Sequence, residues 1–220
     1  MKTNLLPAIK LTILSIVLLI IIYPLIVFGI SQFAPNNGKG EIITQNGKTY
    51  YSNIGQTFTE DRYFNSRPSA VGYNAAGSGG SNKGASNQEY LSEVQARIDT
   101  FLVHNPDVIK SEIPVDLMTA SGSGLDPNIS VQAAYVQVKR IAKIRNTTEA
   151  TLQELIKVQI EKPLIGIFGP KKINVVKLNI ALDNLKNKNM KYLDIKLILG
   201  LGIIMIGAFN NINAQTFFSK

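Results

Sequence analysis

Residues 11–30 read LTILSIVLLIIIYPLIVFGI, a stretch of the chain without a single charged side chain. At a rise of about 1.5 Å per residue, a helix of this length spans the roughly 30 Å hydrocarbon core of a bilayer. Lipid offers no hydrogen-bond partners, so the backbone there must pair with itself, which requires a helix. We therefore predict one transmembrane helix over residues 11–30, in which Pro24 is tolerated, often with a kink.

A cleaved signal peptide is the alternative interpretation of this stretch. Signal peptides have an apolar region of about 7–15 residues and a small-residue cleavage site. Here the apolar region is longer and the residues that follow it match a cleavage site poorly, which favours an uncleaved anchor. Lys2 and Lys10 precede the helix, and no Lys or Arg follows it until Lys39. The positive-inside rule then places residues 1–10 in the cytoplasm and the rest of the chain outside.

The composition excludes several classes of chemistry. The chain has 220 residues, no cysteine and a single histidine, His104. Disulfides and thiolate sites are therefore excluded, and a zinc site or a histidine-dependent triad would have to use that one residue. The net charge is +8, but no dense basic patch with interleaved aromatic residues occurs, so nucleic acid is not a predicted partner. We predict neither a metal site nor a tightly bound cofactor.

Patterning along the rest of the chain predicts an α+β fold. Residues 31–40 are a turn-rich linker, and residues 41–185 form one extracytoplasmic domain of about three helices and a small sheet. The Asn46–Gly47 pair predicts a hairpin within residues 41–52. Helices are expected at about 86–103, after an S-x-x-E capping box that begins at Ser86, and at 130–145 and 148–160; strands are expected at 114–119 and 173–182, and a polar loop at 121–128.

Residues 55–70, GQTFTEDRYFNSRPSA, are dense in aromatic residues and arginines. Taken singly, each residue is more often structural than functional. Together they predict a surface that docks another molecule, with aromatic anchors beside guanidinium groups that pair with carboxylates or stack on rings. The candidates are Phe58, Arg62, Tyr63, Phe64 and Arg67.

A second set of candidates surrounds residues 120–124, ASGSG, which are similar to the G-x-S-x-G nucleophile elbow. Ser121 takes the place of the first glycine of that motif, and His104 is the only available base. Asp116 and Asp126 bracket the loop, either as paired carboxylates or, more often for such residues, as turn-forming hydrogen bonders. A membrane-anchored serine hydrolase using Ser121 or Ser123 therefore stays open as an alternative, and a free-standing anchored binding protein is a third.

Five blocks of sequence follow the anchor in order, and together with the anchor they extend over about residues 8–185. They are residues 54–58 (IGQTF), 63–70 (YFNSRPSA), 73–82 (YNAAGSGGSN), 113–127 (IPVDLMTASGSGLDP) and 174–183 (NVVKLNIALD). In this order they resemble the C chain of the bacterial potassium-transporting ATPase, the Kdp system. The fourth block is long and specific, and the others support it independently. Val131 is a departure, because the family usually has proline there.

The resemblance implies a non-catalytic, accessory subunit of an ATP-driven potassium importer in the bacterial plasma (inner) membrane. Its partners would be a catalytic P-type ATPase chain and a channel-like potassium-binding chain. The subunit would stabilise the assembly and raise the affinity of the catalytic chain for ATP, with Gln56 linked to nucleotide contact by resemblance only.

That implied nucleotide contact conflicts with the predicted topology, because an external domain does not touch cytoplasmic ATP. We therefore expect an indirect effect, a coupling free energy of typically about 1–3 kcal/mol. The docking candidates for such coupling are the five residues of the 55–70 block together with Asp116, Ser121, Ser123 and Asp126.

Residues 186–220 form an atypical tail, of which residues 190–220 have no place in that family pattern. Met190 opens a basic start, residues 197–209 (LILGLGIIMIGAF) are apolar, and Ala214 offers a small residue before a polar one. This is the anatomy of a secretory signal peptide. We hypothesise that the tail is the start of a neighbouring reading frame fused to this one; the alternative is a second, short membrane-associated helix. An intact mass that ends near Lys188 would support fusion, and one that includes Lys220 would support the helix.

Overall fold

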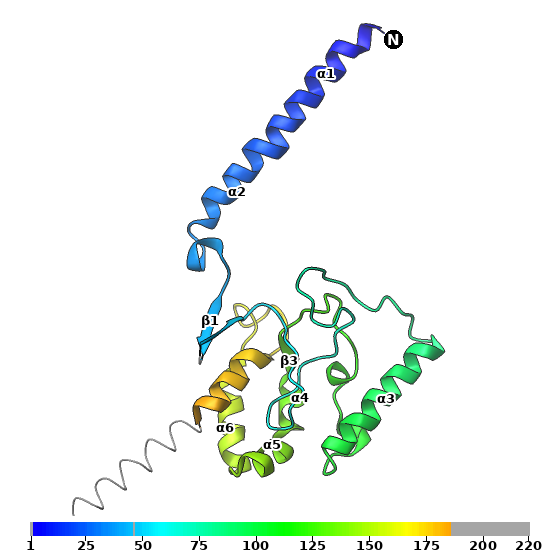
Figure 1. Ribbon diagram of the computed structural model, residues 1–220, viewed down its shortest axis with the longest axis vertical. Helices are drawn as coiled ribbons and strands as arrows, with labels where there is room; N and C mark the ends of the chain where they lie inside the picture. The colour runs from blue at the N-terminus through cyan, green and yellow to red at the C-terminus, as the bar shows by residue number, and fades with distance from the viewer. Residues whose placement is uncertain (1, 46, 186–220) are drawn as a thin grey trace, which may run out of the picture. The chain divides into compact units, whose positions relative to one another are not determined.

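The computed structural model describes residues 2–45 and 47–185 of the chain (Figure 1). The predictions made for residues 186–220 lie outside the described residues. The chain forms two compact units, which divide between Ile54 and Gly55. Each unit is described by itself below.

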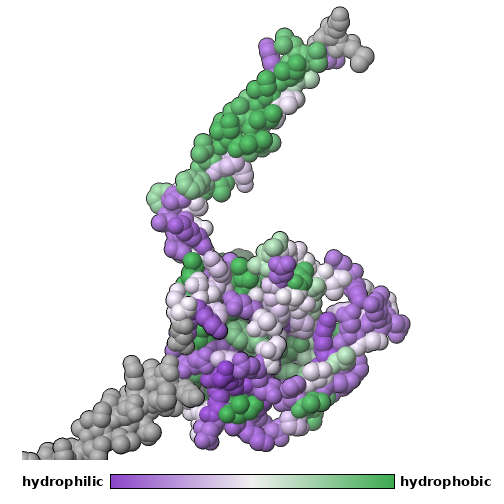
Figure 2. Space-filling model, in the orientation of Figure 1, coloured by the Kyte–Doolittle hydropathy of each residue, from purple (hydrophilic) through white to green (hydrophobic). Residues whose placement is uncertain are grey.

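The first unit is dominated by one long apolar helix. It comprises α1 (Lys2–Ile16), the π-helical segment η1 (Val17–Ile22) and α2 (Tyr23–Ser31). Over Asn4–Ser31 it is long and apolar enough to cross a membrane, and no part of its most apolar window is buried against protein. Figure 2 shows hydrophobic residues covering the visible side of this helix. The predicted apolar helix is confirmed and extends beyond residues 11–30 at both ends.

Pro24 lies in the first turn of α2, directly after the π-helical segment. Proline has no N–H to donate to the carbonyl four residues back, and its ring crowds that carbonyl. Wider π turns commonly occur as single-turn interruptions of α-helices. Here the interruption ends at Ile22, two residues before the proline, and the helix continues through it.

The rest of the first unit is a short connection and a hairpin. A 3-10 turn, η2 (Pro35–Gly38), follows the helix, and β1 (Ile42–Gln45) then pairs antiparallel with β2 (Lys48–Tyr51). Gly47 in the connection has a positive φ of 75°, which glycine adopts without a steric penalty. The hairpin predicted from the Asn–Gly pair is confirmed.

The second unit mixes helices with a small sheet, which confirms the predicted α+β class. The three strands run in the order β3-β5-β4, and both pairings are antiparallel. Its elements are α3 (Gln88–His104), η3 (Lys110–Glu112), η4 (Val115–Leu117), β3 (Asn128–Ser130), α4 (Val131–Tyr135), α5 (Val138–Arg145), α6 (Glu149–Gln159), β4 (Ile160–Glu161), β5 (Lys172–Asn174) and a helix over residues 175–185.

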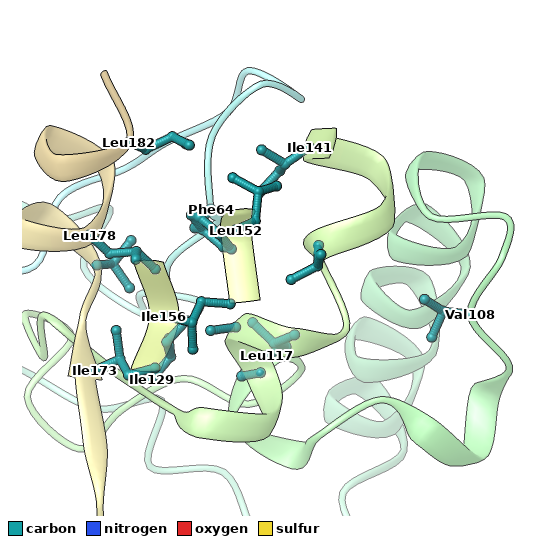
Figure 3. Packing of buried hydrophobic residues seen from close by; sticks show 14 of the residues in the cluster. Phe64, Val108, Leu117, Ile129, Ile141, Leu152, Ile156, Ile173, Leu178 and Leu182 are labelled. Atoms are coloured by element: carbon teal, nitrogen blue, oxygen red, sulfur yellow. The ribbon is translucent and has the colours of Figure 1, made fainter. Parts of the chain in front are cut away.

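One apolar core holds this unit together (Figure 3). Every major helix and the sheet contribute side chains to it. Full burial of one such side chain stabilises a fold by about 1.5–3 kcal/mol. The completely buried members include Phe64, Ile141, Leu152, Ile156, Ile173, Val175 and Leu178.

Two predicted strands are wrong. Residues 114–119 contain the 3-10 turn η4, and the Thr119 hydroxyl that follows it donates to the Val115 carbonyl at 2.9 Å. Residues 173–182 begin with the end of β5 and continue as a helix. Val175, Leu178 and Leu182 are all buried and are spaced for one helical face. The apparent alternation of this stretch concealed a helical period.

Two predicted helices need smaller corrections. The helix expected from residue 130 to residue 145 divides into α4 and α5, and Ser130 caps its start by accepting from the Ala133 N–H at 3.1 Å. The cap of α3 is Asn87 rather than Ser86, and it accepts from the Tyr90 N–H at 2.9 Å. The helix expected over 148–160 is confirmed as α6, capped by Thr148.

Candidate functional site

Residues 58–70, here called the pinned segment, contain no helix or strand, yet they are fixed to the core. The backbone N–H of Phe64 donates to Asn179 Oδ1, and Asn179 Nδ2 donates back to the Phe64 carbonyl, both at 2.9 Å. One side-chain amide thus replaces the partner strand that this backbone lacks. Phe64 is 0% exposed, so its ring packs in the core and does not reach the docking surface expected for it.

Arg140 of α5 is the second anchor of the pinned segment. Its side chain is buried, and burial lowers its pKa while the nearby Asp61 carboxylate opposes that shift. A guanidinium stays protonated in proteins, so its donors must all find partners. The acceptors of the Arg140 N–H groups are the carbonyls of Asp61 and Tyr63 (3.1 Å to the latter) and the side-chain oxygens of Asn65 (2.8 Å), Asn105 (2.9 Å) and Gln137 (2.8 Å).

Two glycine-rich stretches, residues 77–81 and 121–126, lie against the end of the pinned segment; we call them the loop platform. The Ser69 hydroxyl donates to the Gly124 carbonyl at 2.6 Å, and the Gly79 N–H donates to the Ser123 carbonyl at 2.8 Å. Gly124 has a φ of +68°, and a Cβ there would lie 2.6 Å from a methyl of Val71. Only glycine fits this position without displacing its neighbours.

The two aspartates that bracket the platform have structural partners. Asp126 pairs with Arg67 at 3.1 Å and also accepts from the Asn128 N–H at 3.0 Å. Asp116 accepts from the Ser130 N–H at 2.7 Å and from the Ser130 hydroxyl at 3.0 Å, at the start of α4. Both therefore act as the turn-forming residues that such aspartates commonly are.

The residues needed for a serine hydrolase are not brought together. Ser121 is buried, and the Ser123 hydroxyl accepts from the Leu125 N–H at 3.1 Å. His104 lies at the end of α3, with Nδ1 2.8 Å from Asp61 Oδ1. Among the residues that the structure describes, no hydrogen bond joins His104 to either serine, and the two cavities described here that His104 lines include neither serine.

An open groove of about 490 Å³ lies between α3 and the pinned segment. Phe101, Leu117 and Met118 supply apolar lining, and polar side chains including Asp61 and His104 line it as well. Of the docking candidates chosen from the sequence, Phe58 is the one that lines this groove. The apolar lining was missed because such residues, read singly, indicate core rather than surface.

The remaining candidates are not among the residues that line this groove. Arg62 is exposed, pairs with Glu60 at 2.8 Å and places its guanidinium 5.1 Å from the centroid of the Tyr63 ring. The Tyr63 hydroxyl donates to Asp183 at 3.0 Å, and partial burial together with that carboxylate raises the pKa of Tyr63. Gln56 is half-buried, and its carbonyl accepts from the Ser66 hydroxyl at 2.7 Å. Over the described ranges, 2–45 and 47–185, no cluster of acidic or histidine side chains could hold a metal ion.

The family model of the K⁺-transporting ATPase c chain, KdpC, matches residues 5–184. The chain belongs to this family. It is 55% identical over 184 residues to the potassium-transporting ATPase KdpC subunit of Flavobacterium psychrophilum, covering 83% of this chain and 99% of that one. It is 50% identical over 192 residues to the KdpC subunit of Bacteroides fragilis, covering 86% of this chain and all of the other.

The chain is therefore a non-catalytic subunit of the Kdp potassium-transporting ATPase, a complex that uses ATP, and an N-terminal helix anchors it in the membrane. The hydrolase alternative has neither the family nor the geometry in its favour. Residues 186–220 lie beyond the matched region.

Proposed function

We propose that residues 41–185 form an extracytoplasmic domain that docks onto the catalytic P-type ATPase chain and the channel-like potassium-binding chain, and so holds them in a productive arrangement. Its effect on ATP binding by the catalytic chain is then indirect, a coupling between distant sites. The observation that carries the proposal is the groove between α3 and the pinned segment, which has apolar side chains in its lining and polar ones beside them.

The groove has the properties of a preorganised protein-binding site. Binding energy in protein interfaces concentrates where an anchor side chain fills an apolar pocket surrounded by polar groups. Arg140 and Asn179 fix one wall before any partner arrives, so little ordering entropy is lost on binding. Arg97 of α3 lines the groove and donates to the Met118 carbonyl at 3.1 Å, which ties the second wall to the floor.

A matched pair of variants tests the groove. Ala96 of α3 lines it, so Ala96→Trp would fill it, whereas Ala150→Trp places the same ring on the exposed start of α6. We expect Ala96→Trp to reduce severalfold the recovery of the two larger chains on copurification in mild detergent and to raise the KM for ATP. Ala150→Trp should do neither. Unchanged recovery with Ala96→Trp would place the docking surface elsewhere.

The proposed orientation has a separate test, because the chain contains no cysteine. Ala75→Cys introduces one thiol on an exposed loop of the domain. We expect an impermeant maleimide to label it in intact cells. Labelling only after lysis would place the domain on the ATP side of the membrane, and would favour the direct Gln56 contact that the resemblance implies over the indirect mechanism.

A further inference from the structure

The loop between β4 and β5, residues 163–169 with the sequence PLIGIFG, presents apolar side chains to solvent; we call it the apolar loop (yellow in Figure 1). Exposed contiguous apolar surface on a protein usually marks an interaction site. No side chain at residues 164–168 carries a hydrogen-bonding group. The exposed fractions are 71% for Leu164, 81% for Ile165, 75% for Ile167 and 63% for Phe168.

The apolar loop has a defined conformation. Leu164 and Phe168 exchange both backbone hydrogen bonds at 3.1 Å, and the Gly166 N–H donates to the Pro163 carbonyl at 2.9 Å. Ile165 has a φ of +55°, a conformation that β-branched residues rarely adopt. Strained residues of this kind cluster at functional sites. The internal hydrogen bonds also reduce the cost of taking this backbone out of water.

Basic residues flank the apolar loop on both sides. Lys162 precedes it, and Lys171 and Lys172 follow; all three are exposed. Glu161 is the one acidic residue in this stretch, and its carboxylate lies 3.7 Å from the Lys172 ammonium. An apolar tip beside lysines is the pattern of a protein segment that inserts at a membrane interface, where the lysines meet anionic headgroups.

We propose that the apolar loop inserts into the interfacial region of an anionic bilayer and gives this subunit a second membrane contact. The same chain carries a membrane helix that ends at Ser31, and the second unit begins at Gly55, so the connecting residues 32–54 tether the second unit to the bilayer. Such tethering makes the second contact effectively intramolecular, so a small apolar tip suffices. Lipid is favoured over a protein partner because the tip offers no polar side chain for the hydrogen bonds that protein interfaces carry.

The absence of tryptophan from the chain provides a direct test. Phe168→Trp puts a single fluorophore on the apolar loop, and Val103→Trp puts one on α3, where the native side chain is 78% exposed. The full chain is reconstituted in phosphatidylcholine–phosphatidylglycerol vesicles with brominated acyl chains. We expect bromine to quench Phe168→Trp severalfold more than Val103→Trp, and aqueous acrylamide to show the reverse order. Equal bromine quenching of the two variants would overturn the proposal.

Two further measurements complete the test. The double variant Lys171→Gln/Lys172→Gln should reduce bromine quenching of Phe168→Trp severalfold in the anionic vesicles, whereas the control Lys139→Gln/Lys143→Gln on α5 should leave it unchanged. The whole complex is then examined in the same vesicles. If Phe168→Trp is protected there from both acrylamide and bromine, the apolar loop occupies a pocket of a partner chain and the lipid proposal is wrong.

Discussion

The pinned segment and the apolar loop both lie outside the main helices and strands of the domain, but different contacts hold them in place. The backbone of the pinned segment bonds to buried side chains that are distant in sequence, such as Asn179 and Arg140. The apolar loop bonds only to itself in the described part of the chain, and its side chains point into solvent. Irregular backbone can therefore serve either as a rigid wall or as a protruding contact.

The two segments therefore differ in how much their contacts contribute to the free energy of unfolding. A buried polar group that loses its partner costs about 1–3 kcal/mol, so the pinned segment is as costly to disrupt as core packing. Surface substitutions away from such features usually change stability by less than about 0.5 kcal/mol. Substitutions in the pinned segment and its anchors should thus lower the free energy of unfolding much more than substitutions in the apolar loop.

The largest effect is expected for Arg140→Met. It removes a buried charge, and four of its five acceptors lose the hydrogen bond that they accept from it, while Gln137 Oε1 still accepts from the Asn65 N–H; the free energy of unfolding should fall by about 3–5 kcal/mol. Urea unfolding of the full chain in mild detergent, followed by near-ultraviolet circular dichroism, measures it. Arg62→Met, at an exposed guanidinium, is the control and should change stability by less than about 0.5 kcal/mol.

Asn179→Leu should come next. It keeps the side-chain volume but leaves the N–H and carbonyl of Phe64 buried without their amide partner, at a cost of about 2–4 kcal/mol. The same titration applies, and hydrogen exchange at the Phe64 amide should accelerate along with it. A stability loss without faster exchange at that amide would show that the other contacts of the pinned segment, such as those to Arg140, are enough to protect the Phe64 backbone.

Gly124→Ala tests the loop platform and should cost about 1–3 kcal/mol, because the new methyl meets Val71 and the Gly79 carbonyl at a position with positive φ. Gly122→Ala, two residues away, adds the same methyl where nothing lies within 4 Å. Urea unfolding measures both variants. Equal urea midpoints would mean that the loop platform relaxes around residue 124 without a loss of stability.

The smallest effect is expected in the apolar loop, and its sign is opposite. Ile165→Gly should raise the free energy of unfolding by about 0.5–1 kcal/mol, because glycine adopts the positive φ that isoleucine tolerates poorly. Ile167→Gly, at a position without positive φ, should bring no such gain. A destabilised Ile165→Gly variant would show that this side chain packs against the domain and would weaken the comparison.

Local patterns predicted the elements whose signals are local. The apolar anchor follows from composition, the hairpin from its Asn–Gly pair and α6 from the helical spacing of its apolar residues, each within a short window. The strand predicted for residues 173–182 was wrong because the sequence INVVKLNIAL fits both an alternating pattern and a helical one. Packing of Val175, Leu178 and Leu182 against the core selects the helix. The strand predicted for residues 114–119 was wrong because four apolar side chains in six residues suit a short turn as well as a strand.

The site was only partly predictable for the same reason. The sequence drew attention to residues 55–70, where Phe58 lines the groove. It gave no signal that Gln137, Arg140 and Asn179 would hold that stretch, because they lie some 70 to 115 residues further along the chain. Nor did it separate Phe64, whose ring is buried, from the partly buried Phe58 and Tyr63, since aromatic residues suit core and interface alike.

The π-helical segment before Pro24 shifts the rotational position of the side chains about the helix axis between the two α-helical halves of the anchor. A residue added to an α-helix rotates everything beyond it by about 100°. Deleting one aliphatic residue from Val17–Ile22 would therefore turn the N-terminal half of the anchor relative to its C-terminal half and present a different stripe of side chains to neighbouring helices. The facing of this anchor within the bilayer is thus set by residue count as much as by residue type.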